Sequence, residues 1–174
     1  MKHIVCHSGG HSSALVAIEV CRKFGADSVV LLNHDMHFSV EHADIKRFKL
    51  AVADYLELPL TFASRRNATQ DQFDVCVEAQ AFKVDNGAEL CTSRLKTEPF
   101  YDWLKANAPP DESVIYYGFD NTPRERVRMH RRTGILASKG YATDYPLALW
   151  AERTIHATEQ IGILRCHAWR LGHH

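Results

Sequence analysis

The features that mark membrane or exported proteins are missing from this chain of 174 residues. No stretch approaches 18 consecutive apolar residues, which excludes a transmembrane helix of the usual length. The first residues, "MKHIVCHSGG", turn polar too soon for the apolar region of a signal peptide. We therefore expect a cytoplasmic protein that makes no use of a membrane.

An excess of charge of one sign is missing too. Lys and Arg together number 21, as do Asp and Glu, so the formal net charge is zero. This balance argues against a general binder of polyanions, although a local basic patch stays open.

Cysteine and histidine motifs that hold metals are also missing. The five cysteines are odd in number, widely spaced and without a C-x-x-C pair. They support neither a disulfide framework nor an iron–sulfur cluster, and reduced thiols are expected. The eleven histidines include no H-E-x-x-H motif of the kind that binds catalytic zinc.

What the sequence does contain is an alternation of short apolar runs and amphipathic segments. Apolar runs of this kind predict strands at His3–Cys6, Ser28–Asp35, 60–64, Ser113–Phe119 and Tyr141–Tyr145. Helical periodicity predicts helices at Ser12–Phe24, Val40–Leu58, Asp71–Phe82, Thr92–Asn107, Pro123–Leu136 and Ala148–Ile161. We therefore expect one α/β domain over residues 1–174, a three-layer sandwich around a mostly parallel sheet of five strands.

Polar residues follow several of the expected strands. In parallel sheets ligands bind beyond the carboxyl ends of the strands, which makes these residues the candidates for a site. They are Ser8–Ser13, Asn33–Asp35, Ser64–Arg66 and Gly118–Asp120.

The segment "SGGHSS", residues 8–13, joins the first expected strand to the first expected helix. Glycines let the backbone approach a ligand, and the free N–H groups of a helix start favour an anion. The loop matches neither G-x-x-x-x-G-K-[ST] nor G-x-G-x-x-G. Taken alone, it fits a phosphate site and a simple turn without ligand equally well.

Five segments together resemble a known family. "SGGHSS" resembles the PP-loop S-G-G-x-D-S of N-type ATP pyrophosphatases and PAPS (phosphoadenylyl-sulfate) reductases, in the S-G-G-x-[TS]-S form of a phage and bacterial branch. "CTSRLKTEPF" resembles the branch's C-T-x-x-L-K-x-x-P-[FL], and "YYGFDNTPRERVRM" its G-[FY]-x…E-R-x-x-R segment. "YPLALW" and "GILRCHAWRLGHH" resemble its last two segments, and all five occur in the family's order.

The resemblance implies an adenine nucleotide α-hydrolase-like fold and a nucleotide site. It implies that the phosphates or sulfate are held by Ser8, Gly9, Gly10, His11, Ser12 and Ser13. It also implies that Asn33 and Asp35 lie near the adenosine, that Gly118 and Asp120 close the pocket, and that the anion is reached by Arg94, Lys96, Arg126 and Arg128. From the sequence alone, solvated side chains remain the alternative for Arg94 and Lys96.

Two reactions are compatible with this resemblance. One is cleavage of ATP between the α- and β-phosphates, with Ser13 and Lys96 as catalytic residues and Mg²⁺ as cofactor. Ser12 replaces the family's acidic residue, so Asp35 or Asp120 would hold the metal. The other is attack by a thiol on APS or PAPS, with Cys91 as the nucleophile and a thioredoxin-like reductant as partner. The reductases' E-C-G-L-H-type tail is absent from the sequence.

One basic segment stands out in this neutral chain. Five arginines lie between Arg124 and Arg132, and helical spacing places four of them on one face. Guanidinium groups suit phosphate, sulfate or a nucleic-acid backbone, and a solvated face paired with acids is the alternative. A second hypothesis is therefore a non-catalytic nucleotide-binding subunit that docks a nucleic-acid substrate or a partner through Arg124–Arg132. Assembly into a homo-oligomer is compatible with either hypothesis.

Overall fold

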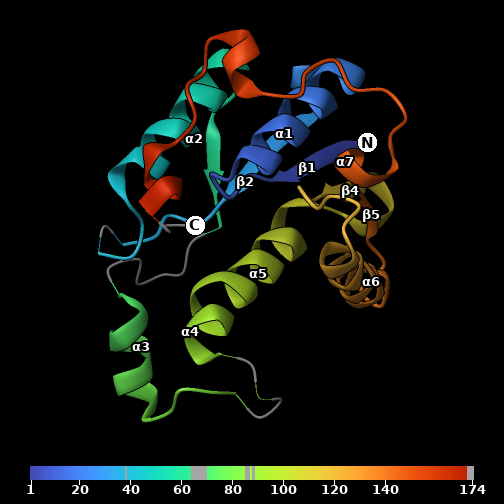
Figure 1. Ribbon diagram of the computed structural model, residues 1–174. Coiled ribbons are helices and arrows are strands. Elements are labelled where there is room, and N and C mark those ends of the chain that lie inside the picture. Colours follow the sequence, from blue (N-terminus) through green and yellow to red (C-terminus); the bar gives the residue numbers. More distant parts are fainter. Residues whose placement is uncertain (38, 64–69, 85–86, 88, 172–174) are drawn as a thin grey trace.

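The protein is built on a parallel sheet of five strands. A computed structural model describes residues 1–37, 39–63, 70–84, 87 and 89–171. The strands are β1 (Lys2–Cys6), β2 (Val29–Asn33), β3 (Leu60–Phe62), β4 (Ser113–Tyr116) and β5 (Ala142–Asp144). Their order is β3-β2-β1-β4-β5, and every neighbouring pair is parallel (Figure 1). The predicted α/β class and the five strands are confirmed.

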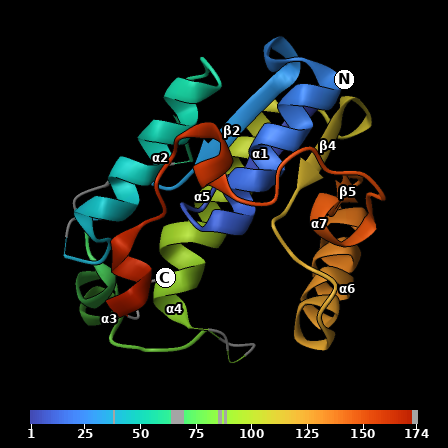
Figure 2. The same cartoon turned by 45° about the horizontal axis from the view of Figure 1, so that its top comes forward.

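Helices cover both faces of the sheet, so the protein is a three-layer sandwich (Figures 1 and 2). On one face Val5, Leu31 and Tyr116 pack with α1 (His11–Phe24), α2 (Ala43–Tyr55) and the C-terminal segment. On the other face Ile4, Leu32 and Ile115 pack with α5 (Glu98–Asn107) and α6 (Pro123–Ala137). Neighbouring strand residues thus alternate between two apolar layers, as both faces of a buried parallel sheet require.

The predicted helix Val40–Leu58 is shorter at both ends. It begins after His42, whose Nδ1 accepts a hydrogen bond from the N–H of Asp44 at 3.1 Å. It ends because Glu57 takes a left-handed φ of 54°, and the N–H of Leu58 returns to the carbonyl of Ala53. Local capping at both ends therefore overrides the longer amphipathic pattern.

The segment between β3 and β4 is helical in pieces. Helix α3 (Gln72–Ala79) starts with a capping box made by Asp71 and Asp74. Helix α4 (Leu90–Thr92), a π-helical turn (Ser93–Thr97) and α5 form the predicted helix Thr92–Asn107 with a widened middle. Pro99 has no N–H to donate to the carbonyl of Leu95, which explains why regular α-geometry gives way just before it. A 3₁₀ turn (Pro110–Glu112) leads into β4.

The predicted helix Ala148–Ile161 is wrong. Helix α7 covers only Pro146–Leu149, and 3₁₀ turns occur at Thr158–Ile161 and His167–Leu171, as one also does at Ala26–Ser28. Side chains take the backbone N–H groups that a helix would need. The buried carboxylate of Glu19 in α1 accepts from the N–H groups of Thr154 (2.7 Å) and Ile155 (3.0 Å). Tertiary hydrogen bonds therefore replace the helical ladder here.

No helix in the described part of the chain is both long and apolar enough to cross a membrane.

Candidate functional site

The order in which strands are added to the sheet reverses between β1 and β4. From β1 the chain continues outward to β2 and β3, and it then crosses to the other side of β1 to form β4 and β5. The connection after β1 leads to α1 on one face, whereas the connection after β4 leads to α6 on the other. At such a reversal the two loops diverge beyond the carboxyl ends of the strands, which is where open α/β sheets bind ligands. The loop Ser8–Gly10 and the loop starting at Gly118 therefore define the candidate site (Figures 1 and 2).

The two loops touch through a glycine. A Cβ built on Gly118 would lie 2.7 Å from the backbone nitrogen of Ser13 and 2.8 Å from the carbonyl carbon of Ser12. Only a residue without a side chain allows this approach. Gly118 thus brings the end of β4 directly against the first turn of α1.

Gly9 and Gly10 leave the start of α1 open. Gly9 has a φ of +85°, and a Cβ on it would lie 2.7 Å from both Ile45 Cγ2 and Lys49 Cε. Gly10 is the N-cap residue, and among the described residues no side-chain cap is bound to the first N–H groups of α1. The first turn also contains no acidic residue. This helix end therefore has the positive partial charge of its dipole without a capping or acidic side chain in its first turn.

Ser13 and Ser8 hold the loop from within. The hydroxyl of Ser13 donates to the carbonyl of Gly10 at 2.8 Å. The hydroxyl of Ser8 donates in turn to the hydroxyl of Ser13 at 3.4 Å. His7 Nδ1 also lies 3.4 Å from the Ser13 hydroxyl. His7 is fully buried, and burial, with the nearby charge of Lys49, lowers its pKa to about 4. The loop therefore rests on a neutral histidine.

Lys49 is a buried cation beneath the loop that the sequence reasoning missed. It is 3% exposed, and its ammonium pairs with Glu41 at 2.5 Å. Burial lowers its pKa, the pairing with Glu41 raises it, and the charges of Lys46 and Lys96 lower it. The helical pattern places position 49 on the inner side of α2. It does not show that the Lys49 side chain lies against Gly9, which only the structure reveals.

The end of β2 contributes a buried amide. Asn33 is 4% exposed, its Oδ1 accepts from the N–H of His34 at 2.6 Å, and its Nδ2 has no hydrogen-bond partner within the described residues. Burial lowers the pKa of His34, and the charges of Lys96 and Lys49 lower it further, against a hydrogen bond to the Ala63 carbonyl. Lys96 is thus within electrostatic reach of this end of the sheet.

Other predicted site residues are engaged elsewhere. Asp35 pairs with Lys46 at 3.3 Å. His11 Nε2 accepts from the N–H of Thr158 at 3.3 Å, which ties the start of α1 to the C-terminal segment. Cys91 is partly buried in α4, beside α3 (Figure 1). The candidate segment Ser64–Arg66 lies outside the described residues.

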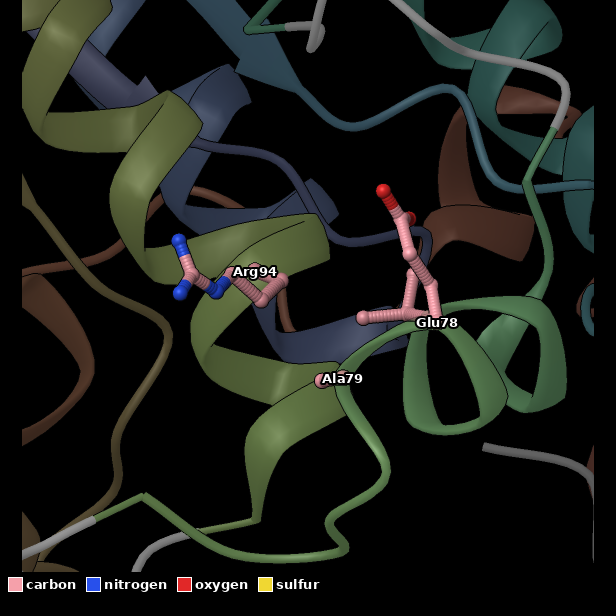
Figure 3. A pocket seen from close by; sticks show the side chains of 4 residues that line it. Glu78, Ala79 and Arg94 are labelled. Atoms are coloured by element: carbon pink, nitrogen blue, oxygen red, sulfur yellow. The ribbon is translucent and has the colours of Figure 1, made fainter.

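Arg94 faces a different hollow. It pairs with Glu98 at 3.1 Å and lines a cavity of about 280 Å³ together with Val75, Glu78 and Ala79 of α3. Figure 3 shows the guanidinium group pointing away from α3. Arg94 is therefore engaged by Glu98 beside α3, while the charge of Lys96 is felt by Lys49 and His34.

The loop after β4 is stabilised by its own polar groups. Asp120 accepts from the N–H of Thr122 at 3.0 Å, and Arg126 donates to the side chain of Asn121 at 2.9 Å. Arg128 pairs with Glu125 at 2.8 Å and lies 4.4 Å above the ring of Phe119. Both arginines thus have intramolecular contacts that hold the start of α6.

Asp35 and Asp120, the two alternative magnesium ligands, each have a polar contact within the protein. Asp35 pairs with the ammonium of Lys46, and Asp120 accepts the hydrogen bond from Thr122 that closes a turn. Within the described ranges, no group of three or more His, Cys, Asp or Glu residues could hold a metal ion. Mg²⁺ at nucleotide sites is usually held by one or two carboxylates together with substrate phosphates, so Asp35 or Asp120 stays a predicted ligand.

Comparisons with protein-family models, with curated proteins and with solved structures find no significant match to this chain.

Proposed function

We propose that this protein binds an adenine nucleotide through its phosphate chain at the loop Ser8–Ser13 and acts on that chain. The observation that carries the proposal is the uncapped start of α1 at the reversal of the sheet, with the Lys49 ammonium buried beneath it. Free N–H groups and the helix dipole favour an anion at this place, and the Lys49 ammonium, although paired with Glu41, adds a positive charge close by. A phosphate chain has enough oxygens to engage all three.

The adenosine end fits the carboxyl end of β2. The Nδ2 of Asn33 is a buried donor with no partner among the described residues, and a buried donor without a partner is costly. An adenine ring nitrogen or a ribose hydroxyl would accept its hydrogen bond. The Asn33 amide is therefore a candidate contact for the nucleoside at this end of the sheet.

Of the two reactions, cleavage of ATP between the α- and β-phosphates fits the side chains better. An acceptor oxygen attacks the α-phosphorus, the bond to the bridging oxygen breaks, and pyrophosphate leaves with the electron pair. The ammonium groups of Lys96 and Lys49 would stabilise the charge that grows on the leaving group. Ser13 would hold the loop in the geometry that presents the N–H groups of α1.

Thiol attack on an adenylyl sulfate has weaker support. Burial raises the pKa of Cys6, the cysteine nearest to the loop in sequence, to about 12 and that of Cys21 to about 11. A thiol attacks as its thiolate, so these two groups are poor nucleophiles at neutral pH. Cys91 remains the candidate for this reaction, and it lies in α4, outside the two loops.

A thermal-shift panel tests the binding. ATP, APS, PAPS and AMP should raise Tm, with the largest effect for ATP, and adenosine without phosphate should leave Tm almost unchanged. Ser13→Ala should remove most of the shift. Ser28→Ala is the matched control, because its hydroxyl also donates to a carbonyl three residues earlier, at 2.9 Å, but at the opposite end of the sheet. If no nucleotide shifts Tm, the proposal is wrong.

The buried cation is tested by a paired substitution. Lys49→Met combined with Glu41→Gln removes the ion pair without leaving one charge buried alone. ATP affinity should fall about tenfold, since a charge-assisted contact contributes about 1.4 kcal/mol, while AMP affinity should change less. Arg165→Met with Glu159→Gln removes an exposed ion pair and serves as the control. Equal losses in both double variants would contradict the role of Lys49.

The chemistry is tested by measuring pyrophosphate release from ATP. Lys96→Ala should abolish release, whereas Lys105→Ala, on the exposed side of α5, should not change it. Binding of ATP without any release of pyrophosphate would leave the nucleotide site standing and refute the reaction.

A further inference from the structure

Helix α6 buries very little of itself. Of its 15 residues only Leu136 is buried, and Met129, Ile135, Arg132 and Glu125 are partly buried. The helix lies at one margin of the molecule, on the side opposite α2 and α3 (Figures 1 and 2). Its remaining residues face solvent, so the exposed side of α6 is available to a partner.

The charge of this exposed side is one-sided. Helix α6 contains five arginines, His130 and a single acidic residue, Glu125. Arg128 pairs with Glu125, but within the described ranges no carboxylate lies within 4.0 Å of the other four arginines, Arg124, Arg126, Arg131 and Arg132. In a chain with zero net charge, these guanidinium groups are an uncompensated local excess.

The arginines also have a defined geometry. At 100° per residue, Arg124, Arg128 and Arg131 lie within about 60° of one another, about 80–140° around the helix from the buried Leu136, and all three are exposed. A rise of 1.5 Å per residue makes the stripe that they form about 10 Å long. One strand of a nucleic-acid duplex carries a phosphate about every 3.4 Å along its axis, so the stripe faces about three phosphates.

We propose that the stripe Arg124–Arg128–Arg131 on α6 binds the sugar–phosphate backbone of a nucleic acid. Guanidinium groups match phosphate oxygens in fork geometry. The aromatic rings nearest to them, Phe119 and Tyr117, lie beneath Arg128 and Arg132 and stack on each other at 5.4 Å. Since these rings are covered, the contact is with the backbone and carries no base sequence.

A lipid surface fits α6 less well. Membrane-surface helices insert an apolar side into the lipid, whereas the apolar side of α6 packs on the protein through Leu136. Val127 is its one strongly exposed large apolar residue, at 69%. A helix surface that is charged but has no exposed apolar side suits a phosphodiester backbone better than a lipid surface.

Fluorescence anisotropy with labelled DNA and RNA duplexes of arbitrary sequence, about 20 base pairs long, tests the proposal. Three phosphate contacts predict that log K falls against log[salt] with a slope of about −2.7. Arg124→Gln with Arg131→Gln should bring the slope to about −0.9 and lower affinity at least tenfold at about 50 mM salt. Comparing the affinities for the two duplexes shows whether the phosphates that the stripe binds belong to DNA or to RNA.

A matched variant controls for charge alone. Arg22→Gln with Lys105→Gln removes two positive charges from exposed positions of α1 and α5 and should leave the slope unchanged. No binding at about 50 mM salt, equal slopes in the two double variants, or equally strong competition by polyglutamate would each overturn the proposal. The Arg124/Arg131 variant should keep its thermal shift with ATP, so failure here is distinct from failure of the nucleotide site.

Discussion

Helices α1 and α6 follow neighbouring strands and begin at the same edge of the sheet, yet they are held in opposite ways. Nine of the 14 residues of α1 are buried, whereas α6 buries one of 15. The start of α1 has no side-chain cap, whereas Thr122 caps α6 and Pro123 opens it. Packing therefore holds α1 and leaves its N-terminus without a side-chain cap, whereas local capping holds α6 and leaves most of its surface exposed.

The largest expected difference between the two regions is their response to acid. Folding lowers the pKa of buried His7 from 6.5 to about 4, so the unfolded chain binds more protons between these values. The stability that this group contributes is complete above pH 6.5 and lost as pH falls to about 4, a change of about 3 kcal/mol. Urea titrations at several pH values should show this loss in the native protein and not in His7→Gln.

His130→Gln is the control, since it removes an exposed histidine from α6. If the free energy of unfolding fell equally steeply with falling pH in His7→Gln and in the unsubstituted protein, buried His7 would not be the cause of that fall.

Alanine substitutions at two glycines should change the free energy of unfolding in opposite directions. Gly118→Ala places a methyl group 2.7 Å from the backbone of Ser13, which cannot yield easily, and should lower the free energy of unfolding by about 2 kcal/mol. Gly134→Ala in α6 meets nothing within 4 Å and should raise it by about 0.5–1 kcal/mol. Denaturant titrations compare the two, and a stable Gly118→Ala protein with full ATP binding would show that the two loops are not in tight contact.

A smaller effect separates stability from binding at Gly10. Its φ of −80° and ψ of 151° suit any N-cap residue, and a Cβ there would meet only Ser8 Oγ, at 3.6 Å. Gly10→Asp should therefore cap α1 as Thr122 caps α6. It should stabilise the protein by a few tenths to about 1 kcal/mol while the carboxylate repels the phosphates.

Thermal melts with and without ATP measure both effects in one experiment. Gly10→Asn gives a similar cap without the charge and should keep part of the ATP shift. If Gly10→Asp bound ATP as the native protein does, the start of α1 would not be the anion site.

The sequence predicted β1, β2 and β4 because each is a short apolar run that the sheet buries on both faces, whereas the edge strands β3 and β5 are only partly buried. It also predicted that polar residues after β1, β2 and β4 would gather at one edge. It failed at residues 148–161, where the pattern is amphipathic but Glu19, 135 residues away from Thr154, takes the backbone N–H groups. It missed Lys49 for the same reason, because a contact between Gly9 and Lys49 has no local signature. Long-range polar contacts are what periodicity cannot reveal.

The clamp between Glu19 and residues 154–155 also sets the order in which the protein can be completed during synthesis. Helix α1 emerges early from the ribosome, but the donors for its buried carboxylate emerge only with Thr154 and Ile155. The strand that flanks β1 on its other side, β4, also comes late, at Ser113–Tyr116. The edge of β1 therefore stays unpaired until β4 has been made, and the Glu19 carboxylate stays without these donors until Thr154 and Ile155 follow.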